Sequence, residues 1–214
     1  MSESSGPSRR DFLRTTAGGL VVGASLSTTG CAANPFGKPR AADELTWGNQ
    51  APGSGSLFDI WLRISPDNII TIYVPSSEMG QGVLTSLPML LADELDVDWK
   101  SVRMEMAPVD TAYRKKMHYG SFHMTAESRS IRALAPILRQ TGAAARHMLT
   151  EAAAASWQVD PSTCKTQGGI VEHPPSGRRA SYGELAPAAA KLSAPSDLPL
   201  RNPSDYRFIG KSVA

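Results

Sequence analysis

The run of residues 69–95 constrains the fold of this chain more than any other, because it predicts a strand, a glycine loop and a helix in direct succession. Residues 69–74 are mostly apolar and β-branched, and residues 83–95 repeat apolar side chains at helical spacing. Between them lies Glu-Met-Gly-Gln-Gly, residues 78–82. At such a loop, backbone N–H groups and the positive end of the helix dipole converge on one point, which favours an anionic ligand.

The residues of this loop suit a phosphate-bearing cofactor. Gly80 and Gly82 have no Cβ, so each can adopt a positive φ and let a ligand approach the backbone. Gln81 is the side chain at the tip that offers both a donor and an acceptor. We therefore predict cofactor contacts from Met79, Gly80, Gln81 and Gly82. The alternative is a plain strand-to-helix turn, because a short Gly-Gln-Gly is a weak motif by itself.

The elements around this run predict an α+β fold, with helices packed against a small mixed or antiparallel sheet. Pro136 should bend or interrupt the longest helix. The expected elements are a hairpin of residues 57–64 and 69–74 with a turn at 65–68, a strand at 102–106, a helix at 131–157, a hairpin of 165–171 and 178–181, and a helix at 182–192.

A long stretch of the chain resembles a known family. Residues 78–103, with residues 139–146, 182–185 and 202–211, resemble the molybdopterin-binding subunit of the xanthine dehydrogenase and aldehyde oxidase family, and most closely its isoquinoline 1-oxidoreductase beta subunit branch. The resemblance covers nearly everything after residue 42 and implies the N-terminal part of a molybdopterin-binding domain.

The resemblance adds a second loop, which lies just before the longest helix. In the family, a Thr-Gly-Gly-Ser or Thr-Ala-Ala-Ser loop at this place contacts the molybdopterin, which implies contacts from Thr125, Ala126, Ser128 and Ser130. The third position is Glu127, which is larger and negative, and Arg129 could offset its charge. Ser128 and Ser130 could instead cap the helix. Cofactor contact and helix capping stay open as alternatives for this loop.

The resemblance also implies a cofactor and partners. Family members hydroxylate an aldehyde or N-heterocycle with molybdenum held by the dithiolene of molybdopterin, often as its cytosine dinucleotide. They pass electrons to an iron–sulfur small subunit, and a c-type cytochrome is a further candidate partner. The family's glutamate base lies near a far C-terminus that this sequence does not contain, so we expect the chain to be either truncated or completed by a separately encoded C-terminal portion. The alternative is a non-catalytic exported binding module.

The start of the chain carries an export pattern. Arg9 and Arg10 lie in a twin-arginine motif at residues 8–14, and an uncharged, weakly apolar run follows at 15–29. That run is too short for a spanning helix, which needs about 20 apolar residues. We therefore predict twin-arginine export to the periplasm or the outer cell surface.

The export pattern sets the expected organisation of the chain. Residues 1–42 form the signal peptide and a linker, residues 43–195 the α+β domain, and residues 196–214 an extended tail. Cys31 follows a Thr-Gly pair in a lipobox-like position, so lipidation at Cys31 and ordinary cleavage just after it are alternatives. Either event leaves Cys164 without a partner, and we expect a buried, unpaired thiol there.

Charge excludes one class of function. The net charge is only +2, and much of the basic excess lies in the leader, so the domain has no electrostatic footprint for nucleic acid. The acidic run of Asp93, Glu94, Asp96 and Asp98 is interpreted as a solvated helix end. The basic residues 114–116 are interpreted as a solvated loop, and contact with a phosphate or an acidic partner is the alternative.

Overall fold

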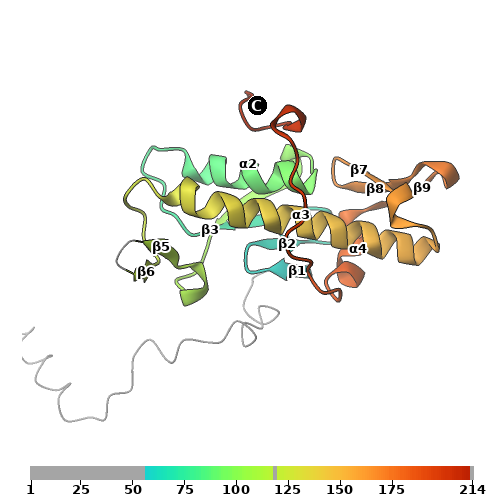
Figure 1. Ribbon diagram of the computed structural model, residues 1–214, viewed down its shortest axis with the longest axis horizontal. Helices are drawn as coiled ribbons and strands as arrows, with labels where there is room; N and C mark the ends of the chain where they lie inside the picture. Colours follow the sequence, from blue (N-terminus) through green and yellow to red (C-terminus); the bar gives the residue numbers. More distant parts are fainter. Residues whose placement is uncertain (1–55, 118–119, 213–214) are drawn as a thin grey trace, which may run out of the picture. The chain divides into compact units, whose positions relative to one another are not determined.

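The computed structural model describes residues 56–117 and 120–212 (Figure 1). The predicted signal peptide and linker at 1–42, with the candidate lipidation site Cys31, therefore lie outside the described residues. Within the described residues, no helix combines the length and the apolar character that crossing a membrane requires.

The largest sheet has four strands in the order β1-β2-β3-β4. They are β1 (Ser56–Asp59), β2 (Leu62–Ile64), β3 (Ile70–Val74) and β4 (Val102–Met106). The first three strands pair antiparallel, whereas β3 and β4 pair in parallel. A parallel neighbour needs a crossover connection, and the predicted strand-loop-helix run supplies it. The predicted α+β class is confirmed, with a mixed sheet.

The prediction of one strand over residues 57–64 is wrong, because the chain turns at residues 60–61 and folds β1 back on β2. Trp61 explains the turn, since it is buried and packs edge-on against Tyr113 at 5.0 Å between ring centroids. The Tyr113 hydroxyl also donates to the carbonyl of Ile60 at 2.6 Å. The predicted turn at 65–68 is confirmed, with Asn68 at φ 63° and its N–H donating to Ser65 O.

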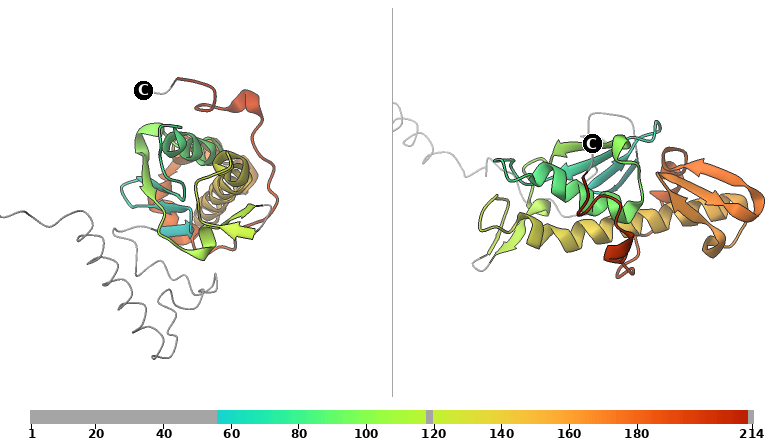
Figure 2. Two further views of the ribbon diagram at one scale, coloured as in Figure 1. Left: turned by 90° about the vertical axis from the view of Figure 1, so that its left-hand side faces the viewer. Right: turned by 90° about the horizontal axis from the view of Figure 1, so that it is seen from above.

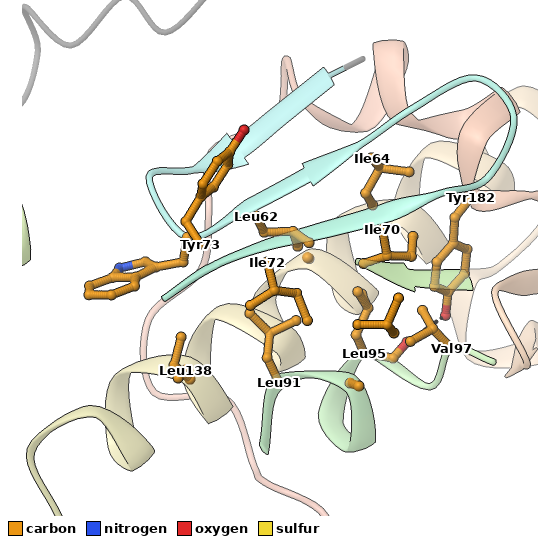
Figure 3. Packing of buried hydrophobic residues seen from close by; sticks show 14 of the residues in the cluster. Leu62, Ile64, Ile70, Ile72, Tyr73, Leu91, Leu95, Val97, Leu138 and Tyr182 are labelled. Carbon is orange, nitrogen blue, oxygen red and sulfur yellow. Dashed lines mark hydrogen bonds between the residues drawn. The ribbon is translucent and has the colours of Figure 1, made fainter. Parts of the chain in front are cut away.

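Two helices cover one face of this sheet. They are α2 (Val83–Leu95), which matches its predicted bounds, and α3 (Ser130–Trp157), and they lie side by side in both views of Figure 2. Figure 3 shows Ile70 and Ile72 pointing from β3 towards the helix layer, and both are fully buried. The core therefore lies between β3 and the two helices. Pro136 lies inside α3 without interrupting it.

A glycine allows α2 and α3 to approach closely. A Cβ added at Gly142 would lie 2.6 Å from the carbonyl oxygen of Leu91 and 2.9 Å from Cβ of Glu94. Gly142→Ala should therefore lower the free energy of unfolding by about 1–3 kcal/mol, the usual cost of overpacking. Urea denaturation measures this change in the free energy of unfolding. Increased stability would contradict this close approach, because alanine in an open helix gains about 1 kcal/mol over glycine.

Two smaller sheets flank this core. The predicted hairpin of 165–171 with 178–181 is corrected to a three-stranded antiparallel sheet of β7 (Lys165–Gln167), β8 (Ile170–His173) and β9 (Arg178–Ser181). Residues 165–171 are themselves a hairpin, because Gly168 and Gly169 adopt positive φ and form a tight turn. Residues 115–122, which carried no strand prediction, form the hairpin of β5 (Lys115–Met117) and β6 (Gly120–Phe122).

The last helix, α4 (Tyr182–Ala189), follows β9 directly and ends before the predicted residue 192. Ser181 and Glu184 form a reciprocal capping box at its N-terminus, which fixes where the helix begins.

The acidic run is not a solvated helix end, contrary to the sequence prediction. Asp93, Glu94 and Asp96 are 1%, 0% and 5% exposed, and we call these three residues the acidic row. The Asp93 carboxylate accepts from the backbone N–H groups of Arg207 (2.7 Å) and Ile209 (3.0 Å). The tail predicted as extended is therefore bound to α2 by hydrogen bonds to buried carboxylates.

Arginines complete the neutralisation of the acidic row. Glu94 forms an ion pair with Arg139 of α3 at 2.8 Å, and Asp96 forms ion pairs with Arg201 (2.8 Å) and Arg207 (3.0 Å) of the tail. Figure 1 shows the tail crossing α3. These pairs explain why charged side chains can be buried at the end of a helix, because a buried charge needs a partner. Asp98 alone of the acidic run is exposed, and it accepts from the N–H of Lys100.

Candidate functional site

The glycine loop between β3 and α2, residues 76–82, is called the first loop. Gly80 and Gly82 adopt φ 91° and 74°, so the predicted positive φ values are confirmed. A Cβ built at either glycine meets no atom within 4 Å. The space beside both backbones is therefore open, which is the access that a ligand needs at this loop.

The backbone N–H groups of the first loop are engaged by the chain's own carboxylate. Glu78 Oε1 accepts from the N–H groups of Gly80 (2.8 Å) and Gly82 (2.9 Å), and Oε2 accepts from that of Leu84 (3.1 Å). These hydrogen bonds, led by that from Leu84, lower the pKa of Glu78. The anion that the sequence predicts at the start of α2 is thus a side chain. A phosphate at these N–H groups would have to displace it.

Gln81 stabilises the same loop by hydrogen bonds to its backbone. Its Oε1 accepts from the N–H of Met79 at 2.6 Å, and its Nε2 donates to the carbonyl of Ser77 at 2.7 Å. An amide group can make about four hydrogen bonds, so these two leave further donor and acceptor capacity on an exposed side chain. Met79 is 70% exposed beside it. The first loop therefore presents an amide and a thioether at its surface.

The second loop, residues 123–130, meets the first loop directly. The Ser77 N–H donates to Thr125 Oγ1 at 2.8 Å, and the hydroxyl oxygens of Ser76 and Ser130 lie 3.1 Å apart. These pairs are separated by 48 and 54 residues in the chain. The structure thus brings together the two loops that the sequence singles out for one cofactor.

The N-cap residue of α3 makes no side-chain capping hydrogen bond. The residue at the N-cap position is Arg129, and neither Ser128 nor Ser130 makes a capping hydrogen bond. Helix capping, one of the two roles considered for these serines, is therefore wrong. The first N–H groups of a helix have no intrahelical acceptor, so this helix end can donate to an anion. Ala126 contributes its carbonyl, which accepts from the N–H of Arg129 at 3.2 Å.

Glu127 adopts a left-handed backbone conformation, and its negative charge lies close to an arginine of the same loop. Glu127 and Ser128 both have left-handed φ values, of 56° and 51°. The Glu127 carboxylate lies 3.6 Å from the guanidinium of Arg129, as the sequence anticipated. The extra negative charge is therefore partly neutralised within the loop.

A buried lysine lies behind both loops. Lys115 is only 3% exposed, and Nζ donates to Ser76 Oγ at 2.8 Å and to the carbonyl of Met124 at 2.6 Å. The prediction of a solvated loop is wrong at this residue, because the β5–β6 hairpin turns its side chain inward. Burial lowers the pKa of Lys115, and burial together with the Lys115 charge lowers the pKa of His123. The sequence favoured a solvated position for Lys115, since three basic residues in a row usually indicate a solvated loop.

The remaining polar groups do not join this site. A pocket of about 570 Å³ lies along the second half of α3 and is lined by Arg146, Thr150 and Cys164 among others. Cys164 is half-buried rather than fully buried, it is unpaired, and burial raises its pKa. In residues 56–117 and 120–212, no group of three His, Cys, Asp or Glu side chains could hold a metal ion.

Comparison with known proteins decides the family. The model of the molybdopterin cofactor-binding domain matches residues 14–209. The chain belongs to this family. This molybdopterin cofactor-binding domain is 35% identical over 195 residues to the isoquinoline 1-oxidoreductase subunit beta of Brevundimonas diminuta, which covers 90% of the chain and 24% of that protein. The resemblance inferred from the sequence is confirmed.

Further similarities of the domain are more distant. It is 29% identical over 218 residues to a membrane-bound aldehyde dehydrogenase [pyrroloquinoline-quinone] of Gluconacetobacter polyoxogenes, covering 98% of the chain and 26% of that protein. The domain thus spans about a quarter of the length of these two relatives. Its similarity to the crystal structure of quinoline 2-oxidoreductase from Pseudomonas putida 86 has a TM-score of 0.43 and 16% identity, over 59% of this chain and 15% of that one.

The residues present fit a molybdopterin. The start of α3 offers uncapped N–H groups and the hydroxyl of Ser130, which suit phosphate oxygens. The first loop offers open space at its glycines and a polar edge at Gln81. In the first loop Glu78 already accepts from the backbone N–H groups of Gly80, Gly82 and Leu84.

Proposed function

We propose that this chain holds molybdopterin between the first and second loops, as the cofactor-binding part of a molybdenum hydroxylase-type oxidoreductase acting on an aldehyde or a small N-heterocycle. The observation that carries the proposal is the junction of Ser77 with Thr125, which joins the two loops in space. Family membership supports the cofactor, and the enzyme names of the relatives support the oxidoreductase class.

The described residues divide the binding between them. Ser128, Ser130 and the first turn of α3 would bind the phosphate group, because the helix end carries partial positive charge and free donors. Gln81 and Met79 would contact the uncharged part of the cofactor, with Gly80 and Gly82 permitting close approach. When bound, molybdopterin with its molybdenum supplies the redox chemistry, while the protein supplies binding and orientation.

Cofactor analysis of the protein purified from its own cells tests this proposal. We expect close to one molybdenum and one pterin per chain, and cytosine monophosphate on acid hydrolysis if the form is the cytosine dinucleotide. We also propose an iron–sulfur small subunit and a c-type cytochrome as partners, which co-purification would detect. Folded protein that lacks both molybdenum and pterin would contradict the proposal, and pyrroloquinoline quinone in their place would point to another cofactor.

A non-catalytic exported binding module is the second candidate. It is favoured by Glu78, which occupies the N–H groups of the first loop, and by Glu127, where the family has a small residue. Folded protein that carries pterin without molybdenum would support this alternative.

Export is part of the proposed function. We expect Arg9→Lys combined with Arg10→Lys to retain the protein in the cytoplasm, because the twin-arginine pair is the export signal. Cell fractionation measures the share of the protein retained in the cytoplasm, with Arg14→Lys as a control outside the arginine pair. Unchanged recovery from the periplasm or cell surface would remove the export proposal. Mass spectrometry of the exported N-terminus separates lipidation at Cys31 from ordinary cleavage.

A further inference from the structure

The buried ammonium of Lys115 touches both loops at once. Its two hydrogen bonds reach the Ser76 hydroxyl of the first loop and the Met124 carbonyl of the second. Ser76 is itself only 1% exposed. We propose that Lys115 is a positioning residue that holds the first and second loops in register for the cofactor, and this inference rests on the proposed function.

Lys115 lacks the partner that a buried cation usually has. In residues 56–117 and 120–212, no carboxylate forms an ion pair with it. Burying an ammonium without a counter-ion is unfavourable, and an apolar side chain of similar length would avoid that desolvation. What the ammonium contributes here is therefore a pair of charge-assisted hydrogen bonds, one to each loop.

The ammonium also fixes the direction of a chain of hydroxyl groups. An ammonium can only donate, so Ser76 Oγ must accept from Lys115. The Ser76 hydrogen can then point to Ser130 Oγ, 3.1 Å away. The Ser130 hydroxyl accepts that bond and keeps its own hydrogen for an outside acceptor. Lys115 thus orients Ser130 as a donor at the start of α3, where we propose that the cofactor phosphate binds.

Lys115→Met tests this inference, because it removes the charge and both donors but keeps most of the side-chain volume. In the full-length protein, hydrogen exchange at the Ser77 amide, which donates to Thr125, should become about tenfold faster. Molybdenum per folded chain should fall by a similar factor. Exchange in the core strand β3 should change little. Lys191→Met, at an exposed lysine after α4, is the matched control and should leave both quantities unchanged.

Each outcome decides the inference. Unchanged Ser77 exchange and unchanged molybdenum in Lys115→Met would overturn it, and so would faster exchange throughout the core, which indicates a purely structural role. If Lys115→Met does not fold, Ser76→Ala decides by the same two measurements, because it removes only the bridging hydroxyl. If the wild-type protein binds no molybdenum, the proposed function fails, whereas selective exchange at Ser77 still shows that Lys115 couples the loops.

Discussion

Glu94→Ala is expected to lower the free energy of unfolding by about 3 kcal/mol, which is the usual order for removing one partner of a buried ion pair. The Glu94 side chain is 0% exposed, and it binds the Arg139 guanidinium at 2.8 Å and the Arg201 N–H at 3.1 Å. Removing it leaves Arg139 without its carboxylate, and the Arg201 N–H without an acceptor. In a domain of this size, Tm should fall by roughly 6–12 °C, measured by differential scanning calorimetry.

The control for this prediction is Glu151→Ala. Glu151 lies on α3, and its side chain is 41% exposed beside His147 at 3.7 Å. Exposed pairs of this kind contribute little, so stability should stay within about 0.5 kcal/mol of wild type. If both variants have the same Tm as the wild-type protein, the acidic row does not stabilise the fold and its burial has another cause.

The predictability of the fold depends on the sequence distance over which each element is stabilised. The β3, α2 and β4 elements were predicted closely, because apolar spacing within about 40 residues determines them. The acidic row was misassigned because its partners lie far along the chain, with Asp93 and Phe208 separated by 115 residues. The pattern Asp-Glu-Leu-Asp at a helix end is the same whether solvent or a tail neutralises it. Only the tertiary structure distinguishes the two cases.

Prediction of the site residues was limited in the same way, because local properties were predicted and tertiary contacts were not. Glycine chemistry predicted the positive φ of Gly80 and Gly82, because that property is local. The role of Glu78 was not predicted, since a carboxylate two residues before a glycine carries no signal that it will turn back onto the loop. Lys115 was misassigned for a similar reason, because its inward direction is set by the pairing of β5 with β6.

Gly82→Asn is expected to remove most of the bound molybdenum while the domain stays folded. Asparagine tolerates the left-handed region better than other side chains, so φ 74° can be kept. The new side chain enters space where a Cβ meets no protein atom within 4 Å. The protein alone therefore has room for it, and a cofactor lying against Gly82 does not. A valine would be a poorer test, because its β-branched side chain would strain the backbone whether or not a ligand binds.

Gly177→Asn is the matched control. Gly177 has φ 67°, also has no atom within 4 Å of an added Cβ, and lies in the turn between β8 and β9, which touches neither loop. The two substitutions impose the same backbone cost, of the order of 1 kcal/mol. Any difference in cofactor content between them therefore reports on what lies beside Gly82.

The decisive measurement is molybdenum per folded chain in these two variants and the wild type, purified in parallel and quantified by plasma mass spectrometry beside a thermal melt. Binding of molybdopterin at the junction of the two loops predicts close to wild-type molybdenum in Gly177→Asn and at least a tenfold loss in Gly82→Asn, with matching melts. Equal molybdenum in all three proteins would contradict it, and would show that the first loop is a strand-to-helix turn that does not contact the cofactor.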